Sequence, residues 1–400
     1  MALTCNGPGE VSGWLRPLLH RLYALEPELD AHVFFVPDDY ATGREAETTR
    51  AMFPRARVHD PKTYVKFALG RPVADVPARV DLVQYLGGDL MHAARLAGRL
   101  DARASTYKFS RPRYRERFAR AFAVDMRNVE QLAAWRTHRD RIVLVGNLAV
   151  DGALMESTPT PDEWDDGILI MPGSRRHEIE QMIPFFFALA LHVREQRPEI
   201  PVAFGLSPFT PLEDVARAVA RGGDPRFYAT KGRVEREGDA AFLASSDGTV
   251  RFPVVPNALA YARRARLVVI IPGTKAIELA ALGAPMVACI PLNVPELIAI
   301  NGPLTYLNRL PVFGSALKRA AVLSVSKRFA HATQPNLDSD EELIHELRGT
   351  LMPGHVARLV LERFDDRAWL AHSREQLRRL YRDHIGAADR MAQGVLECAG

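Results

Sequence analysis

The chain has 400 residues, of which 47% are hydrophobic and 25% charged, and its formal net charge is +4. This length exceeds what one hydrophobic core usually supports, so we expect two domains of a globular protein. No apolar stretch is long enough to span a membrane, and the N-terminus lacks the features of a signal peptide, so we expect a cytoplasmic protein. The odd number of cysteines, far apart in the chain, excludes a disulfide framework or a cysteine metal cluster.

Short apolar runs alternate with helical stretches along the chain, which predicts an α/β fold with parallel sheets covered by helices. The expected strands, in chain order, are residues 33–36, 82–86, 142–145, 168–171, 202–206, 268–271 and 286–290. The segment 151–165 is rich in proline and acidic residues and indicates a linker. We therefore expect a Rossmann-like domain over residues 1–150, a second over 166–365, and C-terminal helices over 366–400 that pack back on the first domain.

A basic run lies between positions 108 and 120, with Glu116 as its only acid. It forms a solvated helix face, or it attracts an anionic membrane surface or an anionic substrate. We discount nucleic acid as a partner because the run carries no recognisable binding module. The basic residues are Lys108, Arg111, Arg113, Arg115, Arg117 and Arg120.

Two segments share one pattern, in which an apolar run, a glycine turn and a hydroxyl residue lead into a helix. The turns are Gly173-Ser174 and Gly273-Thr274. Free backbone N–H groups and the positive end of a helix meet at such a turn, which makes it a site for an anion. Structural capping of the two helices is the alternative interpretation.

Two charged side chains extend this interpretation. Arg175 adds a guanidinium group suited to a phosphate. Glu278, one turn into the second helix, can accept hydrogen bonds from the hydroxyls of a sugar. Together the two segments predict a nucleotide diphosphate that is held by its phosphates at one end and its ribose at the other.

Five collinear motifs resemble those of the lipid-A-disaccharide synthases, a glycosyltransferase family. They are Pro172-Gly-Ser-Arg with Glu178-Ile179, Gly273-Thr-Lys-Ala-Ile-Glu with Ala284-Pro-Met-Val, Gln334-Pro-Asn-Leu, Gly9-Glu-Val-Ser-Gly13 and Val145-Gly-Asn147. The resemblance implies the GT-B fold, in which two Rossmann-like domains face each other across a cleft.

The resemblance also implies an activity and its residues. A UDP-sugar would bind to Gly173, Ser174, Arg175, Gly273, Thr274, Glu278 and Asn336, and Ser12 and Gly13 would lie on the acceptor side. The implied reaction is an inverting sugar transfer to a lipid acceptor at the membrane surface, as in lipid A biosynthesis. We expect it to need no metal, because no Asp-x-Asp pair is suitably placed, and no cofactor. A homodimer is left open.

The sequence departs from this family at the catalytic base. The family has two aspartates after the strand that here ends at residue 86, and only the second remains, as Asp89, with His92 one turn later. Trp14 and Asn147 stand where the family has Asp and His. Asp89 and Glu10 are the remaining candidates for the base, although Asp89 is equally suited to capping a helix.

Two differences in length also separate the chain from the family. The segment 58–82 is shorter and the segment 290–335 is longer, so the acceptor half is altered more than the nucleotide half. Three alternatives follow. They are a glycosyltransferase with a different acceptor, a UDP-sugar 2-epimerase, and a non-catalytic homologue that binds a nucleotide-sugar. An epimerase needs acid/base carboxylates and a histidine that the sequence alone does not place.

Overall fold

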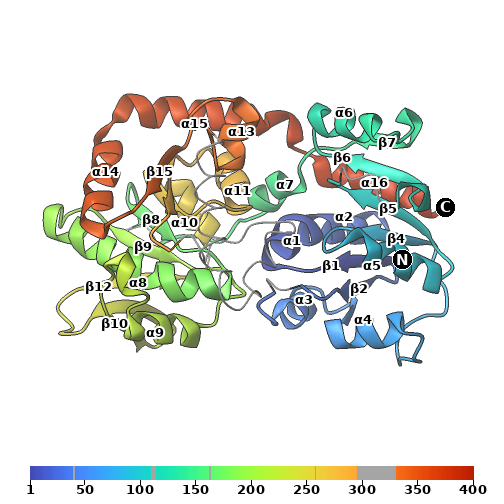
Figure 1. Cartoon of the computed structure of the whole chain (residues 1–400), viewed down its shortest axis with the longest axis horizontal. Coiled ribbons are helices and arrows are strands. Elements are labelled where there is room, and N and C mark those ends of the chain that lie inside the picture. The colour runs from blue at the N-terminus through green and yellow to red at the C-terminus, as the bar shows by residue number, and fades with distance from the viewer. Residues whose placement is uncertain (39–40, 110–113, 162–163, 257, 295–329) are drawn as a thin grey trace, which may run out of the picture. The chain divides into compact units, whose positions relative to one another are not determined.

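The computed structural model describes residues 1–38, 41–109, 114–161, 164–256, 258–294 and 330–400, and these form two units. Unit 1 consists of Met1–Glu156 and Tyr381–Gly400, and unit 2 consists of Ser157–Leu380 (Figure 1). Arg111 and Arg113 of the basic run, and residues 295–329 of the longer segment, lie outside the described residues.

Unit 1 is built on a seven-stranded sheet in the order β3-β2-β1-β4-β5-β6-β7, and every pair in it is parallel. Three neighbouring strands, β2, β1 and β4, are fully buried, as expected for a parallel sheet covered by helices on both faces. Its elements are β1 (Ala2–Cys5), α1 (Pro8–Glu10), α2 (Arg16–Leu25), β2 (His32–Phe35), α3 (Glu45–Met52), β3 (Arg57–His59), α4 (Pro61–Ala68), β4 (Leu82–Tyr85), α5 (Leu90–Arg99), β5 (Arg103–Tyr107), β6 (Arg120–Ala123), α6 (Met126–Ala134), β7 (Ile142–Leu144), α7 (Leu148–Leu154) and α16 (Ala387–Ala399).

The C-terminal helix α16 belongs to unit 1, where it packs against α2 and α7. The Asp151 carboxylate of α7 accepts hydrogen bonds from the backbone N–H groups of Gly386 at 2.8 Å and Ala388 at 2.6 Å. Nε of Arg390 donates to the carbonyl oxygen of Val145 at 2.8 Å. These bonds join the end of the chain to its first 156 residues.

Unit 2 is built on an eight-stranded sheet in the order β10-β11-β12-β9-β8-β13-β14-β15. Strand β11 is antiparallel to both of its neighbours, β10 and β12, and the remaining pairs are parallel. Its elements are β8 (Ile168–Met171), α8 (Arg176–Gln196), β9 (Val202–Gly205), α9 (Leu212–Arg221), β10 (Gly232–Glu237), β11 (Ala240–Ser245), β12 (Arg251–Val255), α10 (Ala258–Arg264), β13 (Leu267–Ile270), α11 (Lys275–Leu282), β14 (Met286–Pro291), α13 (Gln334–Ser339), β15 (His345–Gly349), α14 (Pro353–Asp365) and α15 (Arg367–Tyr381).

The core of unit 2 lies around α8, which buries Phe185, Phe186 and Phe187 against the sheet and its neighbouring helices. This helix reads as hydrophobic nearly all round because α9 and α14 also cover it. The core fixes the start of α8, and so it fixes the turn that leads from β8 into that helix.

Two buried histidines stack near the β3 edge of the unit 1 sheet. Nδ1 of His32 lies 3.0 Å from Nε2 of His59, and the two rings are parallel to within 4°. In this hydrogen bond one neutral imidazole donates to the other. One added proton would give a single imidazolium, and a second would place two cations side by side. Burial lowers the pKa of His59 to about 4, and it also lowers the pKa of His32, against the opposing effect of Asp30.

We expect the chain to lose stability as the pH falls from about 6.5 to about 4, by on the order of 2 kcal/mol. In that window the unfolded chain binds protons at these histidines, while the folded chain keeps them neutral. Above pH 6.5 both states are neutral there, so the contribution is constant. The measurement is the free energy of unfolding in urea at several pH values. His59→Gln should flatten the dependence and exposed His20→Gln should not, and an unchanged dependence in His59→Gln would contradict the account.

Candidate functional site

The carboxyl ends of β8 and β13 lie side by side in the unit 2 sheet, with Met171 beside Ile270. From β8 the chain continues to β9 on one side, and from β13 it continues to β14 on the other. The strand order therefore reverses between β8 and β13, and doubly wound sheets bind their ligands at such a point. The two glycine turns that the sequence singled out, 172–175 and 271–274, are the loops at this position.

Glu178 fills the first of these turns. Its Oε2 accepts hydrogen bonds from the backbone N–H groups of Ser174 and Arg175, both at 3.1 Å. Its Oε1 lies 3.6 Å from Nη1 of Arg175. A carboxylate in the first turn of α8 therefore already occupies the positive end of this helix.

The expected hydroxyl cap is wrong at α8, whereas at α11 Thr274 is the N-cap residue as expected but its side chain does not cap the helix. Ser174 precedes Arg175, which is the N-cap residue of α8, and Thr274 makes no capping hydrogen bond at α11. The physical reason at α8 is that an ionised carboxylate is a stronger acceptor for these N–H groups than a hydroxyl. The predicted phosphate contacts of Ser174 and Arg175 stay a prediction, and they require Glu178 to move aside.

Gly173→Ala should destabilise unit 2 by about 1–3 kcal/mol. Gly173 has a φ of +99°, and a Cβ there would lie 2.5 Å from Oε2 of Glu178 and 2.7 Å from Cδ1 of Ile271. Gly273→Ala is the matched control, because no heavy atom of the described residues lies within 4 Å of its Cβ position. Thermal unfolding of the two variants measures the difference. A Gly173→Ala variant as stable as the unmodified chain would show that the turn adapts without cost.

The second turn is open. Gly273 is exposed, and among the hydrogen bonds of the described residues none uses the backbone N–H of Thr274 or Lys275. Lys275 is the first residue of α11. A cation in the first turn opposes the helix dipole, so Lys275 adds positive charge where the helix end is already positive. The turn therefore combines the positive end of a helix with two backbone donors that no described residue uses.

Glu278 lies beneath this turn and is 1% exposed. One carboxylate oxygen, Oε2, pairs with Nζ of Lys275. The other, Oε1, is buried and has no hydrogen-bond partner in the part of the chain that the structure describes. Leaving a buried carboxylate oxygen without a donor is costly, so this atom is a strong candidate to receive one from a ligand.

Asn336 is fully buried between α13 and β15. Its Nδ2 donates to the carbonyl oxygen of Ile344 at 2.8 Å and to Oε1 of Glu346 at 3.0 Å. Its Oδ1 accepts from the backbone N–H of Ile344 at 2.8 Å. Both donors of the amide are used inside the chain, so this geometry gives Asn336 a structural role and no support for its expected contact with a nucleotide.

In unit 1 the strand order reverses between β1 and β4. In the loop after β1, Nδ2 of Asn6 donates to Oδ2 of Asp38 at 2.7 Å. Glu10 follows in α1. Its Cγ lies 3.1 Å from the point that a Cβ atom would occupy at Gly87, in the loop after β4, so the two loops are in close contact. Glu10 is therefore at the sheet edge where a doubly wound domain presents functional side chains.

The predicted acceptor-side residues Ser12 and Gly13 lie in the π-helix Val11–Leu15, which packs against α7. Gly13 is buried, and its Cα lies 3.5 Å from the Cβ position of Gly152. Close packing of the backbone of this π-helix against that of α7 explains why glycine stands at both Gly13 and Gly152. A contact of Ser12 or Gly13 with an acceptor stays a prediction.

Asp89 and His92 lie at the start of α5. Oδ1 of Asp89 accepts a hydrogen bond from the backbone N–H of Met91 at 2.8 Å, so this exposed carboxylate caps the helix. Nδ1 of His92 lies 2.8 Å from the hydroxyl oxygen of Tyr64. Burial lowers the pKa of His92, which favours the neutral imidazole, and raises the pKa of Tyr64 to about 12. The capping hydrogen bond uses only Oδ1, so Oδ2 of Asp89 remains able to take up a proton.

Trp14 and Asn147, which replace residues of the resembled family, are both packed in unit 1. The ring of Trp14 lies edge-on to Tyr107, with centroids 5.5 Å apart. Asn147 caps α7, and its backbone N–H donates to Nδ1 of His384 at 3.0 Å. Neither position offers an acid or a base, so neither replaces the missing catalytic group.

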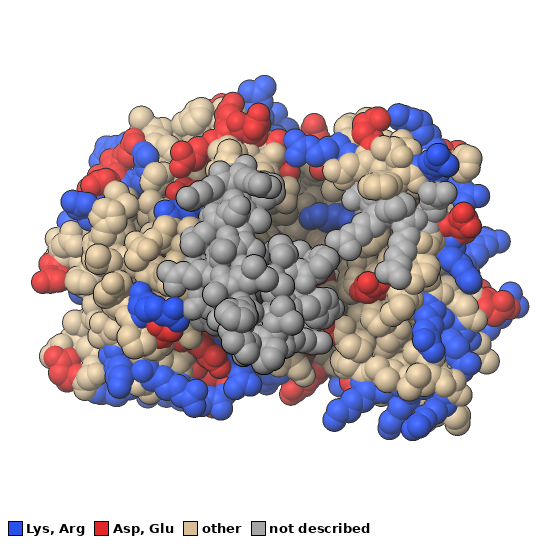
Figure 2. All heavy atoms as spheres, viewed as in Figure 1, with Lys and Arg blue, Asp and Glu red and all other residues tan. Residues whose placement is uncertain are grey.

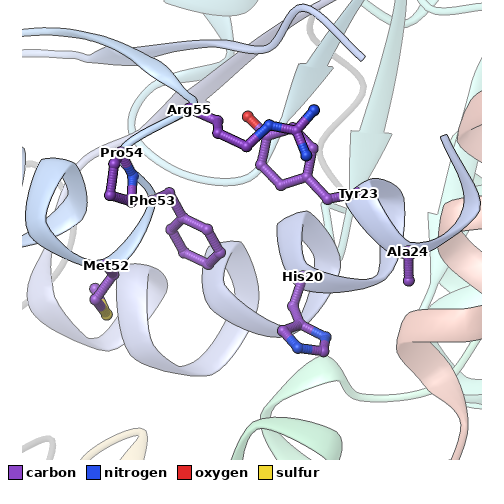
Figure 3. Close-up of a pocket in the computed structure, with 7 residues that line it drawn as sticks. All are labelled: His20, Tyr23, Ala24, Met52, Phe53, Pro54 and Arg55. Carbon is purple, nitrogen blue, oxygen red and sulfur yellow. The ribbon is translucent and has the colours of Figure 1, made fainter. Parts of the chain in front are cut away.

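A cavity of about 380 Å³ lies between α2 and the turn after α3. Figure 3 shows its seven side chains, with residues 52–55 on one side and His20, Tyr23 and Ala24 on the other. Most of the lining is apolar, and the Arg55 guanidinium lies 5.0 Å from the centre of the Tyr23 ring and donates to the carbonyl oxygen of Pro27. This cation is already engaged, so we do not place a diphosphate in this cavity.

Within the described ranges, no group of three or more His, Cys, Asp and Glu side chains is arranged to hold a metal ion. Of the helices that the structure describes, none is both long and apolar enough to cross a membrane.

Similar solved structures share the fold over nearly the whole chain. The UDP co-structure of MnaA from S. aureus is 14% identical, with a TM-score of 0.59, and the match covers 99% of this chain and 95% of that one. The UDP-GlcNAc 2-epimerase from Neisseria meningitidis, bound to UDP-GlcNAc, is 12% identical, with a TM-score of 0.57 and 99% of each chain covered. No protein-family model and no curated protein matches the chain.

These likenesses confirm the predicted α/β fold class with two Rossmann-like units, which is GT-B-like. They contradict the resemblance to the lipid-A-disaccharide synthases, because several of the similar structures are UDP-GlcNAc 2-epimerases, and with it they remove the expected place in lipid A biosynthesis. The physical reason is that the quoted motifs are strand–turn–helix segments. Such segments occur in this kind of fold whatever reaction the protein performs, so the motifs do not identify the reaction.

Sequence reasoning missed the two charged residues that distinguish the turns. Lys275 follows Thr274 directly, and a lysine at the start of a helix after a glycine turn was a usable signal. Glu178 was noted only as part of a motif, although a glutamate in the first turn of a helix is a common partner for N-terminal N–H groups. Their pairing with Glu278 and Arg175 depends on side-chain positions that the sequence does not give.

Proposed function

We propose that the chain binds a UDP-sugar at the β8–β13 strand reversal of unit 2, with the diphosphate at the N-terminus of α11. The observation that carries this proposal is Glu278, a buried carboxylate with one oxygen that has no partner among the described residues. A ribose offers two vicinal hydroxyls, and one of them can donate to that oxygen. The open turn above it has the geometry of a phosphate site.

The diphosphate charge is met by three features of this turn. The backbone N–H groups of Thr274 and Lys275 point out of the helix end, the helix dipole is positive there, and the Lys275 ammonium, although paired with Glu278, has further N–H donors. Because Gly273 has no side chain, a phosphate oxygen can approach its backbone closely. Held in this way, the diphosphate needs no metal ion to offset its charge.

We further propose that the reaction is epimerisation at C2 of the sugar, as in the UDP-GlcNAc 2-epimerases that share this fold. In such a reaction the C2 proton leaves as the C1–O bond to UDP breaks, which gives UDP and a sugar with a C1=C2 double bond. A proton then adds to the opposite face of C2 as UDP returns to C1, so the reaction requires a base and an acid. Asp89 and Glu10 are the unit 1 carboxylates proposed for this chemistry, and neutral His92, paired with Tyr64, is a proton carrier beside Asp89. Epimerisation involves one substrate, so it requires no lipid acceptor.

The test is incubation of the chain with UDP-GlcNAc in D₂O, followed by proton NMR. Epimerisation predicts a second set of sugar signals and loss of the C2 proton signal, because deuterium from the solvent enters at C2. Release of UDP with no new UDP-sugar would contradict epimerisation and indicate transfer or hydrolysis. Binding of UDP-GlcNAc with no change in any signal would contradict catalysis but leave the binding site standing.

A further inference from the structure

Helices α4 and α5 of unit 1 expose three apolar side chains. Val65, Leu69 and Met91 are 39%, 64% and 41% exposed, whereas Tyr64 and Phe67 on the other side of α4 are buried in the core. Single exposed apolar residues are ordinary on protein surfaces. These three differ from isolated exposed residues because cationic side chains lie beside them.

The spacing of the exposed residues on α4 places them on one face. Lys62, Val65, Lys66 and Leu69 follow the pattern i, i+3, i+4 and i+7, so apolar and cationic side chains alternate along a single stripe. The same pattern continues on α5, where Met91 is one turn before Arg95. The stripe is therefore both apolar and basic, unlike an ordinary solvated face.

Two arginines of α5 join the helices at the end where Leu69 stands. Nε of Arg95 donates to the carbonyl oxygen of Ala68 at 2.8 Å. The guanidinium of Arg99 lies 5.2 Å from the centre of the Phe67 ring. These contacts hold both cations beside the exposed end of α4, next to its most exposed apolar side chain.

The cations of this region are not neutralised by acids of the described chain. None of the ion pairs among the described residues uses Lys62, Lys66, Arg95 or Arg99, whose side chains are all exposed. Of the acids next to these helices in sequence, Asp60 and Asp89 cap the N-termini of α4 and α5, and Asp101 pairs with Arg79. Figure 2 shows basic side chains gathered at the lower right, over the part of unit 1 where Figure 1 labels α4.

We propose that these seven residues form a docking surface for an anionic lipid bilayer, which we call the α4–α5 surface (Lys62, Val65, Lys66, Leu69, Met91, Arg95 and Arg99). The apolar side chains would enter the headgroup region while the cations lie near lipid phosphates. A protein partner fits less well, because protein interfaces favour aromatic residues and are depleted of lysine, and this surface has no exposed aromatic side chain. The inference does not depend on the proposed function.

The test is flotation of the full chain with two kinds of vesicle, phosphatidylcholine alone and an equal mixture of phosphatidylcholine and phosphatidylglycerol. The chain should float with the mixed vesicles only, and added salt should release it. Lys66→Gln/Leu69→Ser should lower the bound fraction at least about tenfold, since it removes one cation and one inserted side chain. Tyr228→Ser/Lys231→Gln, an exposed apolar–cation pair in unit 2, is the matched control and should bind as the unmodified chain does.

Three results would overturn the proposal. One is no binding to the mixed vesicles, and the second is equal binding of Lys66→Gln/Leu69→Ser and the unmodified chain. The third is a dimer in sedimentation that this variant dissociates, because the surface would then be an interface between copies of the chain. Circular dichroism and UDP binding show that the variant is folded, and UDP binding also separates this test from that of the proposed function.

Discussion

Replacing Asp89 with Asn should slow turnover of the UDP-sugar by about 10²–10⁴-fold and leave UDP affinity nearly unchanged. Asn caps a helix about as well as Asp does, so the hydrogen bond to the backbone N–H of Met91 should persist and α5 should remain intact. The substitution removes only the capacity of this side chain to take up a proton. The measurement is the turnover rate at saturating UDP-GlcNAc.

Asp125→Asn is the matched control, because Asp125 caps α6 in the same unit and accepts from the backbone N–H of Asn128 at 2.6 Å. It should leave turnover unchanged. Glu10→Gln tests the other carboxylate in the same assay. If Asp89→Asn and Glu10→Gln both turn over at the unmodified rate, neither carboxylate takes part in the chemistry.

Glu278→Gln should weaken UDP binding by about 10- to 100-fold, which corresponds to the roughly 1.5–3 kcal/mol of a hydrogen bond to a charged group. The carboxylate has an oxygen available to a ribose hydroxyl, and it pairs with Lys275 beside the proposed diphosphate position. The amide keeps the shape of the side chain but lacks the charge. Calorimetric titration with UDP gives the change in affinity.

Inorganic diphosphate is the control ligand for this variant. It has no ribose, so its affinity should fall less than that of UDP, or rise because Lys275 loses its ion-pair partner. An equal loss for both ligands would mean that Glu278 acts by supporting the turn and does not contact the ribose.

The seven strands expected from the sequence are all present, because each is an apolar run, and all but the edge strand β7 are largely buried. Several of the strands that were not foreseen lack this signal. Strand β5, Arg103–Tyr107, carries Ser105 in the core, where its hydroxyl donates to Oε1 of Gln84 at 2.5 Å. The hydrogen bond between these two polar side chains forms only when β4 and β5 lie side by side in the sheet. In the sequence alone, a polar residue such as Ser105 therefore gives no indication of a buried strand.

The antiparallel strands β10 and β11 were also missed, and the reason at β10 is a different one. Strand β10, Gly232–Glu237, carries charged residues at most positions because it is the outer strand of the sheet and faces solvent. Charges on an edge strand hide the alternation by which strands are recognised. The pattern of the sequence here is the same as that of a solvated loop.

The candidate site was predictable as far as backbone shape determines it. Gly173 and Gly273 marked the two turns, and the reversal of strand order brings both turns to one edge. The difference between the turns was not predictable, because it depends on Glu178 turning back to its own helix and Glu278 lying beneath the other. Local motifs encode the turns, whereas tertiary packing decides which one stays open.

The most direct test of the proposed site is a crystal structure of the full chain with UDP bound. The account predicts diphosphate oxygens within hydrogen-bond distance of the backbone N–H groups of Thr274 and Lys275, and a ribose hydroxyl on Oε1 of Glu278. A diphosphate at Ser174 and Arg175 with Glu178 displaced, or UDP bound anywhere other than the α11 turn, would contradict it.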